Sequence, residues 1–220
     1  MKQFAIVLAG CGVFDGAEIH EAVITMLNIK QAGCKYYCFT PARNQYHVVD
    51  HLTEEPVAGE NRNILIESAR IARGEIKKLE EYTPSDFDGL LLPGGFGVAK
   101  NFFSYAIDGI KCNIQDDIKA VIINTHKLGK PIGAMCISPL LLVRAFQGTD
   151  IKPIVTLGND PTLIKAVEYM GGVHKICNAD NICVDEKNKL ATTPAYTLAN
   201  DIAEAAAGIE KLINKMIEFN

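Results

Sequence analysis

The sequence predicts an α/β protein with a mainly parallel sheet that is covered by helices on both faces. Two observations support this fold class. Short apolar runs alternate with segments of helical periodicity along most of the 220 residues, a pattern typical of parallel strands joined by crossover helices. No linker, repeat or low-complexity segment interrupts the alternation. We therefore expect one domain over residues 1–220.

The first half of the chain starts with an apolar run, Phe4–Ala9, which stops at Gly10 and predicts a buried strand. Helical spacing follows, with apolar residues at 19, 23, 26 and 27, and Gly33 ends that helix. The predicted elements are a strand at 4–9, a helix at 18–31, a strand at 35–40, an irregular excursion at 44–60, a helix at 62–71 and a strand at 88–92.

The second half continues the alternation and ends in an amphipathic helix. The predicted elements are a helix at 114–128, a strand at 131–135, a helix at 138–146, strands near 153–157, 173–176, 182–185 and 190–193, and a helix at 198–217. The apolar positions of the last helix recur at helical spacing from Ile202 to Met216.

Composition and charge exclude several classes of function. The formal net charge is −4 and no basic run is present, so nucleic acid is not expected as a partner. No apolar run approaches the ~20 residues that a membrane span needs. The apolar start reads as a strand rather than a signal peptide, because glycines and Asp15 interrupt it. The seven cysteines form no CxxC pair, which argues against a metal site or a disulfide framework and favours a reducing cytoplasm.

Cys136 is the candidate nucleophile because it lies at a predicted strand-to-helix turn. The strand is Pro131–Met135, and the helix begins at Ser138-Pro139, where proline is tolerated in the first turn. A side chain at such a turn projects from the carboxyl edge of the sheet, where α/β proteins bind ligands. The positive end of the following helix favours a thiolate, so we expect a lowered thiol pKa. The alternative interpretation is an ordinary buried thiol.

Two further segments reach the same edge of the sheet. The glycines of Leu92–Gly97 allow close approach of the backbone, so its N–H groups could bind an oxyanion, with the N–H of Ile137 as a second donor. A tight turn that needs glycine for its own conformation is compatible with this interpretation. The segment Asp15–Glu21 carries acids, of which Glu18 and Glu21 share a helix face. Either one acid contacts the thiol, or both only complement the helix dipole.

Four segments, taken in order, carry a family resemblance: Gly10–Glu21, Leu92–Gly97, Met135–Pro139 and Thr192–Tyr196. Together they resemble the class I glutamine amidotransferase-like, or PfpI-like, superfamily. More narrowly they resemble its ElbB branch, described as isoprenoid biosynthesis proteins with an amidotransferase-like domain or as enhancing lycopene biosynthesis proteins. The resemblance spans nearly the whole chain. It implies a flavodoxin-like three-layer α/β/α sandwich with one amidotransferase-like domain over residues 1–220.

The resemblance also implies roles for single residues. Cys136 would be the nucleophile, with the carboxyl of Glu21 against its thiol and Glu18 as the second candidate. Gly95 and Ile137 would be backbone oxyanion donors, and Gly94 in the same loop is a further candidate for binding substrate. Members of the ElbB branch are associated with a cofactor-free glyoxalase activity on small 2-oxoaldehydes such as methylglyoxal and glyoxal, which become hydroxy acids.

We therefore expect an enzyme of the glyoxalase type that takes a small carbonyl compound and uses no cofactor or metal. Related folds often pair, so we also expect a homodimer. Two alternatives assume little catalysis: a redox or stress-responsive binding protein whose thiolate oxidises readily, or a binding partner in isoprenoid metabolism.

The chain departs from this family at its histidines. Ile137 stands where protease-like relatives have a histidine directly after the cysteine, and 156–160 contains none where amidotransferases place one. These differences argue against peptide and glutamine hydrolysis. His20 is a candidate proton shuttle, but neighbours on a helix point about 100° apart, so His20 and Glu21 cannot both face the thiol. His174, from a distant strand, is the alternative.

Overall fold

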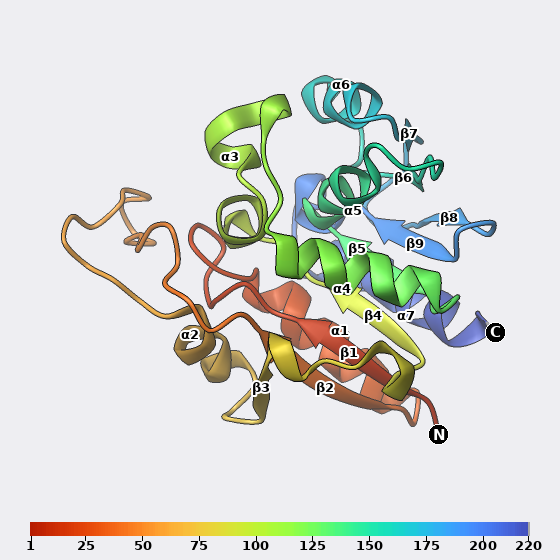
Figure 1. Cartoon of the computed structure of the whole chain (residues 1–220), viewed down its shortest axis with the longest axis horizontal. Helices are drawn as coiled ribbons and strands as arrows, with labels where there is room; N and C mark the ends of the chain where they lie inside the picture. Colours follow the sequence, from red (N-terminus) through yellow and green to blue (C-terminus); the bar gives the residue numbers. More distant parts are fainter. Residues whose placement is uncertain (220) are drawn as a thin grey trace.

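A seven-stranded sheet forms the centre of the computed structural model, which describes residues 1–219 (Figure 1). The strands lie in the order β3-β2-β1-β4-β5-β9-β8, and all neighbouring pairs are parallel except β8 and β9. The strands of this sheet are β1 (Gln3–Val7), β2 (Lys35–Thr40), β3 (Ile76–Lys78), β4 (Gly89–Leu92), β5 (Ile132–Met135), β8 (Cys183–Asp185) and β9 (Leu190–Thr193). This architecture confirms the predicted fold class.

Helices cover both faces of the sheet (Figure 1). The first and last helices, α1 and α7, pack together on one face, and α4 and α5 lie on the other. The helices are α1 (Ile19–Gln31), α2 (Ile64–Ile71), α3 (Tyr105–Asp108), α4 (Asp116–Lys127), α5 (Ser138–Phe146), α6 (Pro161–Tyr169) and α7 (Ile202–Glu218). Within residues 1–219, no helix has both the length and the apolar character that a membrane span requires.

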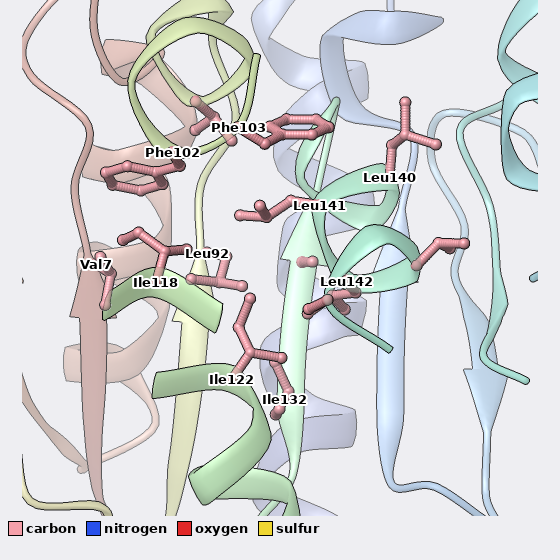
Figure 2. Packing of buried hydrophobic residues seen from close by; sticks show 14 of the residues in the cluster. Val7, Leu92, Phe102, Phe103, Ile118, Ile122, Ile132, Leu140, Leu141 and Leu142 are labelled. Carbon is pink, nitrogen blue, oxygen red and sulfur yellow. The ribbon is translucent and has the colours of Figure 1, made fainter. Parts of the chain in front are cut away.

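The buried strands supply side chains to two apolar cores because successive residues point to opposite faces. In β1, Phe4 and Ile6 belong to the core under α1 and α7, whereas Ala5 and Val7 belong to the core under α4 and α5. Figure 2 shows the second core, where Ile122 of α4 reaches toward the sheet. Strands buried on both faces read as continuous apolar runs, which is the pattern seen in the sequence.

Helix α1 faces the sheet with a different side from the one that its apolar spacing suggested. Ile19, Val23 and Leu27 are exposed, and the buried face instead includes Glu21 and Thr25, both with no exposed side chain. The helix itself is confirmed, and Met26 is buried as its apolar spacing predicted, but the other three predicted apolar positions lie outward. A carboxyl group on the buried face is costly unless it is protonated or hydrogen-bonded, so Glu21 requires an explanation from the site.

Several parts of the fold differ from the predicted elements. The edge strand β3 has only three residues, and α6 follows Asp160 and Pro161, which cap and start it. The short strands β6 (Ile154–Val155) and β7 (Val173–His174) were expected in the sheet, but they form a separate parallel pair. They are too short to extend a seven-stranded sheet, and α6 lies between them in the chain. Helix α7 begins four residues later than expected because Asp201 caps it.

The chain order of the strands reverses direction at β1, which pairs with β2 on one side and β4 on the other. Open α/β sheets bind ligands at such a reversal, outside the carboxyl ends of the strands. The loops that follow β1, β4, β5 and β9 meet at this edge, and all four family-like segments lie in these loops or at their borders.

Truncation of Ile122 tests the core under α4. Its side chain is fully buried, so Ile122→Ala should lower the free energy of unfolding by about 2–5 kcal/mol through lost contacts and a residual cavity. Ile66 on α2 is 65% exposed, and Ile66→Ala should change the free energy of unfolding by less than about 0.5 kcal/mol. Urea unfolding of both variants measures the difference, and equal losses would contradict the described core.

Candidate active site

The backbone at Cys136 adopts a left-handed conformation, with φ of 59°, between β5 and α5. Such a conformation costs about 1–3 kcal/mol in a residue other than glycine and persists only where neighbours impose it. Two contacts do so here. The N–H of Cys136 donates to the carbonyl of Thr193 at 3.1 Å, and the hydroxyl of Ser138 donates to the carbonyl of Pro93 at 2.7 Å. The predicted turn is therefore present and fixed to the ends of β9 and β4.

Glu21 lies against the thiol of Cys136 and forms a side-chain hydrogen bond with it. Its carboxyl group is fully buried and accepts two further hydrogen bonds, from the N–H of Gly94 at 2.8 Å and from the N–H of Tyr196 at 3.4 Å. Of the two acids considered, Glu21 is thus the one beside the thiol. Glu18 instead caps α1, where it accepts the N–H of Glu21 at 2.7 Å.

The glycine loop after β4 is where the backbone comes closest to this pair. A Cβ atom at Gly94 would lie 2.9 Å from Oε2 of Glu21 and 3.0 Å from Sγ of Cys136, so a larger residue would displace them. Gly95 has a φ of 103°, which favours glycine. The N–H groups of Gly95 and Ile137 both donate to the sulfur. The N–H of Gly94 donates to the carboxyl group of Glu21. Gly94 therefore positions the acid, and its N–H does not point to a substrate as the sequence analysis considered.

The thiol pKa moves in the direction opposite to our expectation from the helix terminus. Burial and the carboxylate of Glu21 raise the pKa of Cys136 well above its usual range, and the N–H groups of Gly95 and Ile137 only partly oppose this. Burial and the charge of Glu18 raise the pKa of Glu21 to about 8. Two anions in this buried position would repel each other, so the pair retains at least one proton at neutral pH and titrates as a unit.

A cavity of about 470 Å³ opens over the sulfur of Cys136. Its other lining residues come from five regions: the loop after β1, the loop after β4 with α3, the turn after β5, the start of α6, and the turn after β9. They are Val13, Gly95, Phe96, Ala99, Tyr105, Ala106, Ile137, Asp160, Thr162, Leu163, Tyr196 and Thr197. The thiol is therefore at the base of a volume large enough to hold a small molecule.

The histidines are not beside the thiol. His20 is exposed on α1, and its Nδ1 lies 2.8 Å from the hydroxyl of Tyr196, which lines the cavity. His174 accepts the N–H of Leu157 at 3.0 Å and does not line the cavity. Among residues 1–219, no histidine lines it. His20 therefore reaches the site only through Tyr196, a residue whose contact with the site the sequence analysis did not identify.

A larger hollow in the described part of the chain differs in chemistry from the cavity at Cys136. A wider hollow of about 560 Å³ lies beside β2 and β3, where Lys30, Lys35 and Lys77 contribute to its walls, but none of the predicted site residues does. In the described part of the chain, no group of three or more His, Cys, Asp or Glu side chains is arranged to hold a metal ion. The Cys136 cavity is therefore the candidate active site.

Comparison with curated proteins finds close relatives over the full length. The chain is 37% identical to glutamine amidotransferase-like class 1 domain-containing protein 3, mitochondrial, of Homo sapiens, over 99% of this chain and 83% of that protein. It is also 37% identical to the ES1 protein homolog, mitochondrial, of Rattus norvegicus, over 99% of this chain and 84% of that protein. Those names give a mitochondrial location for the relatives, which differs from the cytoplasm that we expected for this chain. No family model matches the sequence.

A solved structure is similar over the whole fold. It is an isoprenoid biosynthesis protein with an amidotransferase-like domain from Ehrlichia chaffeensis, with a TM-score of 0.93 and 39% identity. The alignment covers 100% of this chain and 99% of that one. This similarity agrees with the resemblance drawn from the four sequence segments.

Replacement of Glu21 by glutamine tests the buried carboxyl group. Its pKa is near 4.5 in a solvated chain and about 8 in the fold, so its stabilising contribution is complete below about pH 4.5 and is lost as the pH rises through about 8. Between about pH 4.5 and 8, the free energy of unfolding of Glu21→Gln should therefore rise relative to that of wild type, by on the order of 2–4 kcal/mol in total. Urea unfolding at several pH values measures the gain.

The exposed Glu210 on α7 supplies the matched control. The free energy of unfolding of Glu210→Gln should differ from that of wild type by the same small amount at every pH in this range, because the substitution changes an exposed side chain and not a buried one. If the free energy of unfolding of Glu21→Gln also followed that of wild type at a constant distance over this pH range, the carboxyl group of Glu21 would not be desolvated, and the described site would be contradicted.

Proposed function

The chain belongs to the glutamine amidotransferase-like class 1 domain family that includes the ES1 proteins, and we propose that it is a thiol-dependent enzyme of the glyoxalase type. The reaction would convert a 2-oxoaldehyde and water to a 2-hydroxy acid. The observation that carries the proposal is the pair of Cys136, which lines the cavity and is partly exposed, and the fully buried Glu21 beside it, in a cavity that no histidine of residues 1–219 lines. The pair offers a nucleophile and one mobile proton, which this reaction requires.

The first step is addition of the sulfur to the aldehyde carbon. The pair gives up one proton as the pH rises, and the remaining proton is shared between sulfur and carboxyl group. The thiolate of Cys136 forms the C–S bond, and the proton held by Glu21 passes to the carbonyl oxygen, which gives a hemithioacetal and a carboxylate. The N–H groups of Gly95 and Ile137, which donate to the sulfur in the free site, lie where they could also stabilise the developing oxyanion.

The second step moves one proton between the two carbons of the substrate. The carboxylate of Glu21 removes the proton from the former aldehyde carbon, which gives an enediol, and returns a proton to the neighbouring carbon. The product is a thioester of the 2-hydroxy acid on Cys136. Water then cleaves the C–S bond, which releases the acid and restores the thiol. A carboxyl group with a pKa of about 8 is a suitable proton carrier near neutral pH.

Tyr196 connects this pair to solvent. Its N–H donates to Glu21, the residue is one of those that line the cavity, and its hydroxyl lies 2.8 Å from Nδ1 of the exposed His20. We assign the Tyr196 hydroxyl the role of exchanging protons with the enediol oxygens, with His20 as its contact to water. Under this proposal His20 would act as a proton shuttle through Tyr196 rather than by direct contact with the thiol.

Glutamine hydrolysis is disfavoured by the same site despite the family name. A Cys–His pair is the usual means of protonating an amine leaving group, and no histidine among residues 1–219 lines this cavity. A 2-oxoaldehyde has no leaving group that requires such a proton. The absence of a lining histidine therefore argues against glutamine hydrolysis but not against conversion of a 2-oxoaldehyde.

Replacement of Cys136 tests the proposal directly. Cys136→Ala should reduce methylglyoxal consumption to the uncatalysed rate, because it removes the only thiol that lines the cavity of the described chain. Cys177 is partly exposed and lies outside this cavity, so Cys177→Ala should retain wild-type turnover. Lactate formation without added glutathione or metal is the measurement. Equal turnover by wild type and Cys136→Ala would refute the proposal.

Replacement of Tyr196 by phenylalanine tests the proton path. The ring and the N–H to Glu21 are retained, so only the hydroxyl is lost, and kcat should fall by about 10²-fold with little change in KM. His20→Ala should lower kcat less, because water can replace an exposed imidazole. Steady-state kinetics on methylglyoxal give both values. A larger effect of His20→Ala than of Tyr196→Phe would reverse the assigned order of the relay.

A further inference from the structure

The cavity over Cys136 is much larger than the substrates that the family resemblance suggests. Its volume of about 470 Å³ would hold roughly fifteen water molecules at ~30 Å³ each. A three-carbon aldehyde bound at the sulfur would occupy only a small part of it. Volumes of about 300–1,000 Å³ are typical of sites that enclose much larger ligands. Most of the cavity therefore has no role if methylglyoxal is the substrate.

Apart from Thr162, the part of the wall contributed by α3, α6 and the loop after β4 is apolar or aromatic. Phe96 is 50% exposed although it follows directly after Gly95, next to the reacting sulfur. Ala106 of α3 and Leu163 of α6 line the cavity with it, and Tyr105 of α3 is a further lining residue. Exposed aromatic surface beside a nucleophile suits an aryl or branched alkyl group, which gains free energy when it leaves water.

The charges of the cavity exclude an anionic substituent. No lysine, arginine or histidine of residues 1–219 lines it, so a carboxylate or phosphate would have no cationic partner there. The N-terminus of α6 could attract an anion, but Asp160 already accepts its first free N–H groups, at 2.6 Å from Thr162 and 3.1 Å from Leu163. These hydrogen bonds lower the pKa of Asp160, which is therefore ionised and repels a second anion.

From this volume, wall and charge we infer that the substrate is an uncharged 2-oxoaldehyde with an aryl or branched alkyl group on its ketone carbon. The aldehyde carbon meets the sulfur of Cys136, and the apolar group fills the space between Phe96, Ala106 and Leu163. The inference rests on the proposed function for its chemistry, whereas the selectivity of the cavity can be measured without turnover. It narrows the substrate class beyond small oxoaldehydes in general.

Comparison of phenylglyoxal with methylglyoxal is the first test. The kcat/KM for phenylglyoxal should exceed that for methylglyoxal by roughly ten- to a hundredfold, because the phenyl ring buries apolar area that a methyl group lacks. Phenylglyoxal that carries a para-carboxylate should lose most of this advantage. An equal or higher kcat/KM for methylglyoxal in the wild-type enzyme would overturn the inference.

A variant that fills the cavity locates the selectivity. Ala106 is exposed on α3, so Ala106→Trp adds volume to the wall without disturbing a core. It should lower kcat/KM for phenylglyoxal at least tenfold more than it lowers kcat/KM for methylglyoxal. Ala203 is exposed on α7 and does not line the cavity, so Ala203→Trp should change neither. Equal losses for both substrates in Ala106→Trp would contradict the placement of the aryl group.

Binding of unreactive ketones separates this inference from the proposed function. Acetophenone should bind more tightly than acetone in calorimetry by at least tenfold, and Ala106→Trp should remove the difference. If neither oxoaldehyde is turned over but acetophenone is preferred, the glyoxalase proposal fails and the apolar selectivity stands. If methylglyoxal is turned over and the two ketones bind equally, the proposal stands and the selectivity fails.

Discussion

The hydrogen bond from the N–H of Gly94 to the buried carboxyl of Glu21 is the contact on which the site depends. It joins the loop after β4 to helix α1, and the same carboxyl group meets the thiol that follows β5. Three elements far apart in the sequence are thereby fixed around one sulfur atom. The carboxyl group is out of water, so its charge is disfavoured, and it retains a proton that a solvated acid would lose. The chemistry proposed for Cys136 follows from this desolvation rather than from the helix that follows the cysteine.

The sequence predicted the elements that carry strong local signals. Strand β2 and helix α5 lie where the pattern placed them, and the turn at Cys136 was expected from the residues on either side of it. The sequence could not predict which of several opposing influences on the pKa of Cys136 is the strongest. The dipole of α5 favours a thiolate at Cys136, but burial and the Glu21 carboxylate oppose it and prevail. That balance depends on atoms that only the folded chain brings together.

The faces of α1 show a second limit of pattern reading. Of the four positions that apolar spacing marked, only Met26 is buried, and the buried face of α1 also carries the polar Glu21 and Thr25. The far wall of the cavity was missed for a different reason, since α6 was not predicted. Asp160 followed by Pro161 is a recognisable start of a helix, so this signal was available. Without α6, the sequence could not identify Leu163 as a residue of the cavity wall.

The left-handed backbone at Cys136 places chemistry and folding in opposition at one residue. Glycine adopts a φ of 59° without a steric penalty, so a glycine at this position would relieve strain while it removed the nucleophile. Selection for stability alone would therefore favour loss of the thiol. A descendant gene that had lost its catalytic role would be expected to drift toward glycine at this turn while it kept the surrounding glycine loop. In a set of diverging copies, the identity of this one residue would separate chains still under selection for chemistry from those kept for binding or assembly.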